Sequence, residues 1–431
     1  MTPIRHAKGP KHLRRRVRRR ILPKFLLAFF VALVGLSTVF GFAVADRMKS
    51  QQLDFLTAAS DVARENNLGP VVAIAENIYY GYLNAPKVGG TPTLAAGFDG
   101  STATTSNRNP VAGVSNNPAA NLKLWGPASG VSALPPRVQS PVSPLPGEGV
   151  WMPTKIVVNG YTAMYVARIR PDRLHTSMFA TLAWFDPKLL AFDQIAGTKM
   201  PEGDFAHGGG RVPTKRRPFY MVGFASGYHM KDSQGGAIVN STLVRRLVRG
   251  KATLLTYPDG SLDIVEWKFD KFKPGFTSAR QNLDMLVNNG ESQVVSEDQA
   301  KWGQVWYGTG SGKNYIWRTA IGLRADGTVV YVQSQALSAK SLADMLVRAG
   351  VVKGMSLDMN EAFANGYMYG PYGSKGQPIN PDNKNPSDRF YKKSTRDFIA
   401  VYAKSPSSAP QPSGTPQPSS TPRPSITHKA G

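Results

Sequence analysis

Residues 317–333 read Trp317-Arg-Thr-Ala-Ile-Gly-Leu-Arg-Ala-Asp-Gly-Thr-Val-Val-Tyr-Val-Gln333, which is two apolar runs joined at Asp326-Gly327. Asp-Gly between apolar runs is typical of a two-residue β-hairpin turn. An amphipathic run from Ser338 to Ala349 follows, with serine as the helix N-cap and Gly350 as the stop. A last apolar run ends at Asp358. The stretch predicts a hairpin, a helix and a strand, in that order.

Strand patterns also occupy the chain upstream of this stretch. Tyr161 to Ile169 alternates as a strand does, and residues 252–257 and 262–267 flank a second Asp-Gly turn at Asp259-Gly260. Because strands outnumber helices, the sequence predicts an α+β fold: a mixed, strand-rich sheet with a few packed helices.

Acidic and amide side chains gather where the last apolar run ends. Asp358 is followed by Asn360 and Glu361. A carboxylate at the end of a buried strand is costly to desolvate, so it needs a cation, a metal or a substrate. We expect Asp358 to lie open in a cleft, facing guanidinium groups from distant loops. The competing interpretation is that Asp358 caps a turn and Glu361 is merely exposed.

The order of these motifs resembles the phosphodiester glycosidase family. The resemblance rests on Arg318-Thr-Ala-Ile-Gly322, the Asp326-Gly327 turn, the helix after Ser338 and Leu357-Asp358, and covers about residues 150–375. It implies a strand-rich domain that hydrolyses a sugar phosphodiester. The family has glycines and a serine after its aspartate, whereas this chain has Met359-Asn-Glu-Ala362, a form similar to a bacterial branch.

The resemblance implies site residues as well. Two carboxyl groups can divide acid, base and nucleophile roles, which suggests Asp358 and Glu361 as catalytic residues. His229 is a third candidate, because imidazole titrates near neutral pH. A phosphodiester carries one negative charge that a guanidinium can hold bidentately. The candidate substrate-binding residues are Arg318, Arg280, Asn282, Asn360, Ser226 and Gly227, the last two within the segment similar to the family's Asn-Gly-Gly-Phe motif. For either arginine, a structural ion pair with Asp358 is the alternative.

The chain contains no cysteine, and its six histidines follow no metal-binding spacing. The proposed hydrolysis requires no cofactor. The alternative is that oxygen atoms of Asp358 and Asn360 bind a divalent cation such as calcium. The sequence does not identify a metal.

The N-terminal part of the chain predicts a membrane anchor. Residues 1–24 carry ten Lys and Arg and no acid, and residues 25–45 carry no charge. About 20 apolar residues cross a bilayer, and the basic flank keeps the N-terminus in the cytoplasm. We therefore expect a single-pass protein of the cell membrane with an extracytoplasmic C-terminal domain. The alternative is a cleaved signal peptide ending at Ala43-Val-Ala45.

Composition divides the rest of the chain. Residues 46–83 have helical spacing and predict a juxtamembrane helix, and residues 84–149 contain ten prolines and nine glycines, as in a linker. Residues 150–404 form the predicted domain, and residues 405–431 form a disordered Pro/Ser tail.

The net charge of +24 favours an anionic partner. A cell-envelope glycan or glycan phosphodiester fits this charge. A basic helix or aromatic-studded strand for nucleic acid is not found, so no nucleic-acid partner is expected. The predicted function is a membrane-anchored hydrolase of sugar 1-phosphodiesters in an envelope glycan. The alternative is a non-catalytic polysaccharide-binding module of the same fold.

Overall fold

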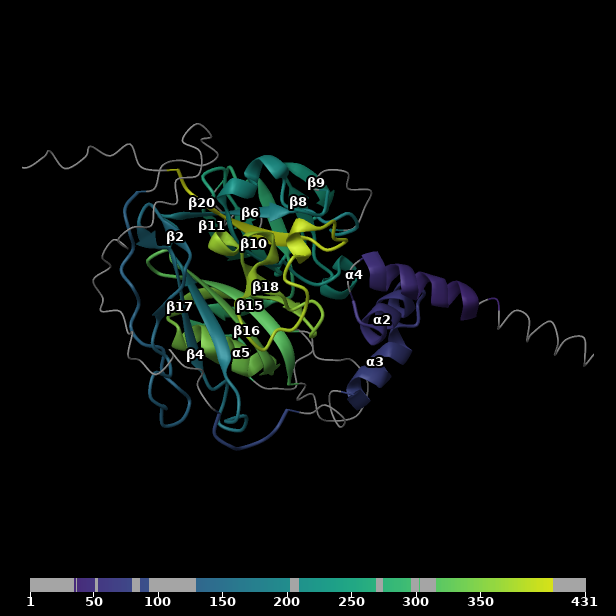
Figure 1. Cartoon of the computed structure of the whole chain (residues 1–431), viewed down its shortest axis with the longest axis horizontal. Helices are drawn as coiled ribbons and strands as arrows, with labels where there is room; N and C mark the ends of the chain where they lie inside the picture. The colour runs from purple at the N-terminus through teal and green to yellow at the C-terminus, as the bar shows by residue number, and fades with distance from the viewer. Residues whose placement is uncertain are drawn as a thin grey trace, which may run out of the picture.

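The structure is a computed structural model, shown in Figure 1. It describes residues 35, 37–50, 53–79, 86–92, 129–201, 209–268, 274–295, 302 and 315–405. The predicted basic segment 1–24, most of the predicted anchor 25–45 and nearly all of the predicted tail 405–431 lie outside the described residues.

The largest layer is an eight-stranded sheet in the order β1-β4-β5-β16-β15-β17-β13-β14. Each strand runs antiparallel to its neighbours. Its strands are β1 (Met152–Pro153), β4 (Met164–Ile169), β5 (Ala180–Phe185), β13 (Met285–Asn288), β14 (Glu291–Ser292), β15 (Ile316–Arg324), β16 (Val329–Leu337) and β17 (Val351–Met359).

The predicted hairpin, helix and strand form the centre of this sheet. β15 and β16 pair around the Asp326-Gly327 turn, where Gly327 has a φ of 79° that favours glycine. Helix α5 (Ala339–Arg348) begins with a capping box between Ser338 and Ser341 and buries Leu342 and Leu346 against the sheet. β17 then returns beside β15 and ends one residue after Asp358. These three predictions are confirmed.

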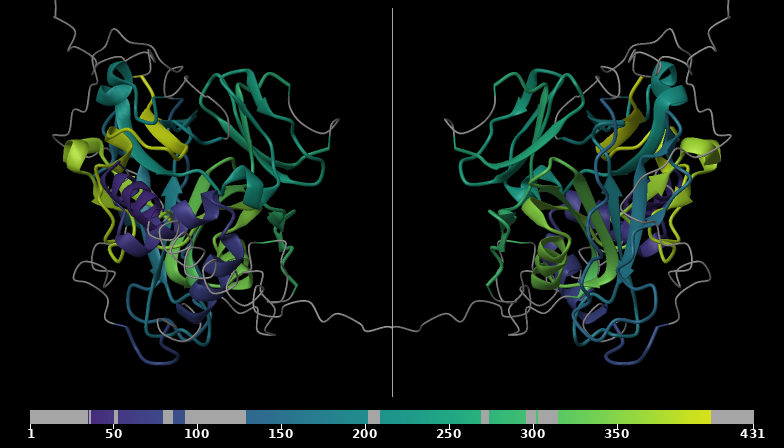
Figure 2. Two further views of the ribbon diagram at one scale, coloured as in Figure 1. Left: turned by 90° about the vertical axis from the view of Figure 1, so that its right-hand side faces the viewer. Right: turned by 90° about the vertical axis from the view of Figure 1, so that its left-hand side faces the viewer.

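Two further sheets of five strands complete the domain, and Figure 2 shows the first as a separate layer beside the long strands. The first consists of β11 (Leu262–Glu266), β10 (Ala252–Thr256), β12 (Ser278–Gln281), β8 (Ala237–Val239) and β9 (Thr242–Arg245). The second consists of β19 (Gln377–Pro378), β18 (Gly366–Met368), β7 (Tyr220–Ala225), β20 (Phe398–Ala403) and β6 (Leu190–Ile195). Side chains from all three sheets share one core cluster, which includes Leu254, Phe224 and Leu357.

The remaining elements are short. They are the strand pair β2 (Val157–Val158) and β3 (Tyr161–Thr162), helix α4 (Met230–Ser233), and the 3-10 turns Thr214–Phe219, Gly370–Lys375 and Arg389–Tyr391.

The predicted α+β class is confirmed, and one detail differs. The strand pairings in the described ranges are antiparallel, whereas the sequence suggests a mixed sheet. Parallel pairing requires crossover connections, and here hairpins such as β10–β11 and β15–β16 join neighbouring strands directly.

The segment expected to be one juxtamembrane helix is divided. Residues 37–50 are helical, and two further helices follow, α2 (Phe55–Glu65) and α3 (Gly69–Ile78). The chain turns between α2 and α3 at Asn67, whose φ of 62° no helix accommodates. α2 packs against the domain (Figure 1), and its Val62 shares a buried cluster with Phe363. Among the described residues, no helix is both long and apolar enough to span a membrane.

The segment assigned to a linker also contributes to the domain. Within residues 129–149, Glu148 is fully buried and its carboxylate lies 2.8 Å from the Arg170 guanidinium. The Ser132 backbone N–H donates to the Asp186 carboxylate at 2.9 Å. Composition alone misses such specific pairs, because it counts prolines and glycines and not partners.

Gly322 of the Arg318–Gly322 motif is required by close packing. A Cβ added there would lie 2.4 Å from a methyl group of Val351 on the neighbouring strand. We expect Gly322→Ala to lower the free energy of unfolding by about 1–3 kcal/mol, measured by urea denaturation. The double variant Gly322→Ala/Val351→Ala removes the clash, so its loss should be smaller than the sum of the two single losses. Additive losses would contradict this explanation.

Candidate active site

Asp358 lies at the end of the central strand β17, where the chain leaves the sheet. Its backbone carbonyl accepts a hydrogen bond from the Thr319 hydroxyl at 2.7 Å, which fixes the strand end against β15. Its carboxylate accepts from the Met359 backbone N–H at 3.0 Å. Asp358 is 4% exposed, and burial raises the pKa of its carboxyl group, although the charge of Arg396 opposes this shift. The expectation of an open carboxylate is therefore wrong.

A guanidinium group from a distant loop does face Asp358, as expected, but it belongs to Arg396. One Nη atom of Arg396 lies 3.3 Å from the Asp358 carboxylate. The guanidinium carbon lies 3.8 Å from the centre of the Phe363 ring, within cation–π range. Arg396 precedes β20, so the sheet containing β7 and β20 presents this cation to the end of β17.

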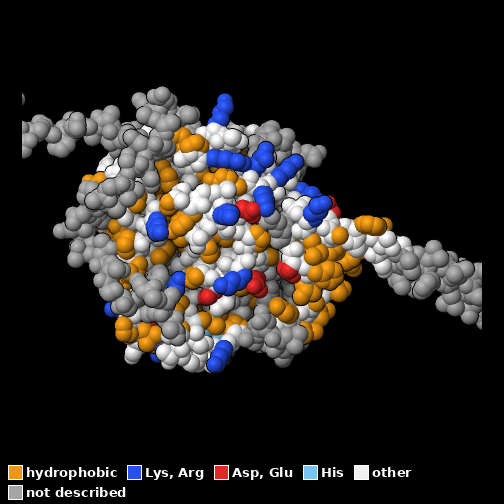
Figure 3. All heavy atoms as spheres, in the orientation of Figure 1, with side chains coloured by type: hydrophobic (Ala, Val, Ile, Leu, Met, Phe, Trp, Pro, Cys, Tyr) orange, Lys and Arg blue, Asp and Glu red, His pale blue; other side chains and the backbone are white. Residues whose placement is uncertain are grey.

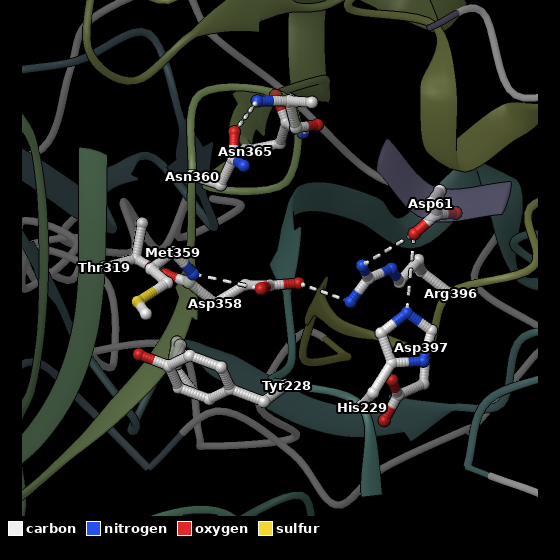
Figure 4. Close-up of polar contacts among 12 residues, drawn as sticks. Asp61, Tyr228, His229, Thr319, Asp358, Met359, Asn360, Asn365, Arg396 and Asp397 are labelled. Atoms are coloured by element: carbon white, nitrogen blue, oxygen red, sulfur yellow. Dashed lines mark hydrogen bonds and ion pairs between the residues drawn. The ribbon is translucent and has the colours of Figure 1, made fainter. Parts of the chain in front are cut away.

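Helix α2 presents a second carboxylate, that of Asp61, to the other side of the same cation. Figure 4 shows Asp358 and Asp61 on opposite sides of the Arg396 guanidinium. Asp61 lies 3.9 Å from Arg396, 3.6 Å from Nε2 of His229 and 2.6 Å from Arg47. Burial would raise the pKa of Asp61, but the His229 hydrogen bond and the two arginine charges lower it overall.

His229 stands at the N-cap position of the short helix α4, close to this cluster. Its side chain is 19% exposed, and its ring nitrogen reaches the Asp61 carboxylate. The structure thus brings two of the predicted catalytic residues, Asp358 and His229, to the same side-chain cluster. Arg396 and Asp61 connect them.

Arg280 forms a buried ion pair elsewhere. Its Nε atom lies 2.8 Å from the Asp397 carboxylate, and both side chains are at most 2% exposed. Its two terminal nitrogens donate to the Gln281 carbonyl at 2.7 Å and the Tyr228 carbonyl at 2.6 Å. The predicted alternative of a structural ion pair therefore describes Arg280, with Asp397 as the partner in place of Asp358.

Arg318 is also buried, on strand β15. Its guanidinium donates to the Leu337 carbonyl at 2.9 Å and the Trp302 carbonyl at 3.1 Å. It also hydrogen bonds to the Tyr228 hydroxyl, which lies close enough to Asp358 to feel its charge. Burial raises the pKa of Tyr228, so this hydroxyl remains protonated. Arg318 thus anchors a phenol beside the candidate acid.

Three further predicted binding residues are Asn282, which follows β12, and Ser226 and Gly227, which follow β7. The Asn282 amide donates to the carbonyls of Ser356 and Leu357 at 2.6 and 3.1 Å, directly before Asp358. A Cβ on Gly227 would lie 3.1 Å from that amide, so glycine permits the close approach. The Ser226 hydroxyl hydrogen bonds to the Gln194 amide, at 2.9 Å. In this arrangement these polar groups contact protein atoms.

The loop after Asp358 turns sharply. Asn360 has a φ of 77°, a left-handed conformation that asparagine tolerates better than most residues. Its side-chain oxygen accepts from the Ala362 backbone N–H at 3.4 Å. Glu361 is exposed, in agreement with the alternative that the sequence leaves open. The backbone angle of Asn360 is one that glycine and asparagine tolerate better than other residues.

The oxygen atoms proposed as cation ligands already face hydrogen-bond donors. Asp358 faces a guanidinium and a backbone N–H, and Asn360 faces the Ala362 N–H. In the part of the chain that the structure describes, no three His, Asp or Glu side chains are placed to hold a metal ion.

Several residues of the cluster carry no local sequence signal. Arg396 and Asp397 lie in an unpatterned loop, and Asp61 lies on a helix about 300 residues upstream of Asp358. Tyr228 lies between two residues that the sequence does suggest, Gly227 and His229, and a search of that motif for side chains could have found it.

A family model described as phosphodiester glycosidase matches residues 220–358, the segment from β7 to Asp358. No curated protein matches this chain in sequence.

Solved structures are also similar in part. The catalytic domain of zebrafish N-acetylglucosamine-1-phosphodiester α-N-acetylglucosaminidase, described as auto-inhibited by its pro-peptide, is 16% identical, with a TM-score of 0.37; the match covers 56% of this chain and 82% of that one. A hypothetical protein from Synechocystis is 8% identical, with a TM-score of 0.35 and coverages of 56% and 64%. At these TM-scores and identities, neither similarity indicates the function of this chain.

The family match includes Tyr228, His229, Arg318 and Asp358, while Arg396 and Asp61 lie outside it. The resemblance inferred from the motif order is thereby confirmed over residues 220–358, which match the phosphodiester glycosidase model.

Proposed function

We propose that the protein is a membrane-anchored, extracytoplasmic hydrolase that cleaves a sugar 1-phosphodiester in a cell-envelope glycan. In this proposal residues 25–45 cross the cell membrane once, with the N-terminus in the cytoplasm. The basic flank of that segment supports this orientation, and the positive net charge favours an anionic substrate.

One observation carries the hydrolytic function. The strand-end carboxylate of Asp358, at the end of a segment that matches a glycosidase family, lies 3.3 Å from the Arg396 guanidinium, and the His229 imidazole reaches the same cluster through Asp61. A carboxyl group beside a guanidinium and an imidazole is a combination suited to cleavage of a glycosyl phosphate, because charge develops on the departing phosphate and both groups can donate hydrogen bonds to it. The contact also differs from an ordinary surface ion pair, because burial of the Asp358 carboxylate removes it from water at a cost in free energy.

The proposed reaction breaks the bond between the anomeric carbon and the phosphate oxygen. The bonding electron pair leaves with the phosphate, whose charge Arg396 neutralises while the His229 ring hydrogen bonds to it. Water supplies the new hydroxyl on the anomeric carbon, and its proton passes to the Asp358 carboxylate and then to solvent. Alternatively, Asp358 attacks the carbon first and water hydrolyses the ester, with Glu361 as the second carboxyl group. Either route yields the free sugar and a phosphate monoester.

The position of the Asp61 carboxylate indicates where the phosphate of the substrate would bind. Its carboxylate occupies a position where Arg47, His229 and Arg396 converge. Its contacts with His229 and Arg396, at 3.6 and 3.9 Å, are longer than strong ion pairs, so a phosphate could approach both side chains more closely. In this interpretation the substrate anion displaces Asp61, and α2 shifts to admit it.

Purified full-length protein incubated with an α-linked sugar 1-phosphodiester tests the proposal. Release of free sugar and of phosphate monoester in equal amounts is expected. No release from several sugar phosphodiesters would overturn the hydrolytic assignment.

Removing the competing carboxylate should strengthen substrate binding. We expect Asp61→Asn to lower KM for the phosphodiester about fivefold, which corresponds to about 1 kcal/mol. The reason is that Arg396 no longer shares its charge with the Asp61 carboxylate. Steady-state kinetics at several substrate concentrations measures this effect.

The pH dependence of stability provides the control. Because its pKa is lowered in the folded protein, Asp61 contributes stability above the ordinary aspartate value near ~3.9, and this contribution is lost as pH falls further. Wild type should therefore exceed Asp61→Asn in stability at pH 7, and the difference should shrink in acid. An unchanged or raised KM would show that the substrate phosphate binds elsewhere.

The non-catalytic binding module remains the second candidate, because Asp358 is almost fully buried. Glycan affinity that survives Asp358→Asn, together with no hydrolysis by either protein, would favour it. Sugar release by the wild type excludes it.

A further inference from the structure

The N-terminal helical segment, from residue 37 to residue 79, exposes many apolar side chains. Of the fourteen large hydrophobic residues exposed in the described ranges, nine lie between Val39 and Tyr79. Figure 3 shows hydrophobic side chains gathered at the right-hand side, in the region of α2. We call the following six residues the apolar face: Phe55 and Leu56 of α2, Leu68, and Val71, Ile74 and Ile78 of α3. Exposed apolar surface of this kind marks an interaction site.

The spacing of the exposed residues agrees with a surface that lies flat. Val71, Ile74 and Ile78 are separated by three and four positions, so they form one stripe along α3. Helix α2 carries apolar residues on two sides. It buries Ala58 and Val62 against the domain and exposes Phe55 and Leu56.

The chain leads directly from the uncharged segment into this face. Ala45, the last residue of that segment, is only ten residues before Phe55, which limits their separation to about 35 Å. Val44 is 2% exposed and shares a buried cluster with Phe363 of the loop after Asp358. Val44, at the end of the proposed span, therefore contacts the domain in place of lipid, and in this proposal the bilayer begins directly beside the apolar face.

The candidate site lies close to the same helices. Asp61 of α2 lies beside the site cations, and Phe55 of the same helix is 60% exposed. A helix is about 10–12 Å wide, and interfacial helices bury their apolar face about 5–10 Å into the lipid boundary. Arg396 and His229 would then lie about one helix diameter from the level of the lipid headgroups.

We propose that the apolar face of α2 and α3 lies on the outer leaflet of the membrane, and that the site acts on glycosyl phosphodiesters whose alcohol group is a lipid of that leaflet. This rests on the proposed function, and it specifies the substrate class. A lipid-linked phosphodiester carries its phosphate at the headgroup level, where Arg396 and His229 would receive it, while its hydrocarbon stays in the bilayer.

The absence of cysteine allows a direct test with single-cysteine variants. Full-length Leu56→Cys and Ile74→Cys proteins, each carrying a nitroxide label, are reconstituted in vesicles of phosphatidylcholine and phosphatidylglycerol. Leu243→Cys is the matched control, because Leu243 of β9 is 64% exposed and Leu56 is 62% exposed. Collision with oxygen, which concentrates in lipid, is compared with collision with a water-soluble nickel chelate. We expect the oxygen-to-nickel ratio to be at least about threefold higher at positions 56 and 74 than at 243.

Two results would overturn membrane docking. The first is equal water accessibility at all three positions. The second is protection from both reagents that increases with the protein-to-lipid ratio, which would assign the face to a second copy of the chain.

A kinetic measurement tests the substrate class separately. The variant Phe55→Ser/Leu56→Ser should turn over a lipid-linked sugar phosphodiester in vesicles at least about fivefold more slowly than wild type, while it turns over a short, soluble phosphodiester at the wild-type rate. Equal effects on both substrates would overturn the lipid-linked class. If wild type cleaves neither substrate, the proposed function fails, and the nitroxide data still decide whether the face docks on lipid.

Discussion

Replacing Asp358 with asparagine is expected to lower kcat by about 10³-fold or more, because general acid–base and nucleophilic groups each contribute effects of this size. The substitution keeps the shape of the side chain and its acceptor for the Met359 N–H. It removes the charge that faces Arg396. Sugar release from a phosphodiester, followed under saturating conditions, measures the effect.

Glu361→Gln is the matched control for this variant. Glu361 is a carboxylate three positions further along the same loop, but it is exposed. Its replacement should reduce kcat about tenfold or less if Asp358 carries the chemistry. A larger loss for Glu361→Gln than for Asp358→Asn would transfer the principal role to Glu361.

The pH dependence of stability shows whether Asp358 keeps its buried position in solution. Burial raises its pKa, so the folded protein holds this proton at pH values where the unfolded chain has released it. The folded state therefore loses stability relative to the unfolded state as pH rises from the ordinary aspartate value near ~3.9 through the raised one. Asp358→Asn lacks the titrating group, so its stability should fall less over this window. Identical slopes for the two proteins would indicate a solvated carboxylate.

Replacing Arg280 with methionine is expected to lower the free energy of unfolding by about 3–5 kcal/mol, because it leaves Asp397 buried without its cation. Arg280 and Asp397 lie 2.8 Å apart, and neither side chain is more than 2% exposed. Thermal and urea denaturation measure the loss. The same variant should retain the KM of the wild type under conditions where it is folded, because the Arg280 donors contact protein atoms.

Two controls separate burial from charge. Lys353→Met removes a partly exposed pair with Asp263 of similar length, 2.7 Å, and should cost about 1 kcal/mol or less. Arg280→Met/Asp397→Leu removes both buried charges and should recover much of the lost stability. If Arg280→Met is as stable as wild type but binds substrate poorly, Arg280 is a substrate ligand, as the sequence suggests.

The sequence by itself determined the central hairpin, helix α5 and strand β17. Asp326-Gly327 specifies a turn, Ser338 and Gly350 specify the ends of a helix, and the apolar run before Asp358 specifies a buried strand. Each of these signals acts between residues close in the chain, so no knowledge of the fold is needed to interpret it. The position of Asp358 at the end of a core strand follows from them.

Only the tertiary structure decided which residues surround Asp358. The sequence suggests Arg280 and Arg318 as its cationic neighbours, but Arg396 faces the carboxylate and Arg280 pairs with Asp397. Asp61 reaches the same cluster from helix α2. Ion pairs between residues tens to hundreds of positions apart depend on how sheets and helices pack, and charges in unpatterned loops give no local indication of their partners. Burial likewise depends on neighbours from the whole chain, which is why a strand-end acid expected in the open lies beneath an arginine and a helix.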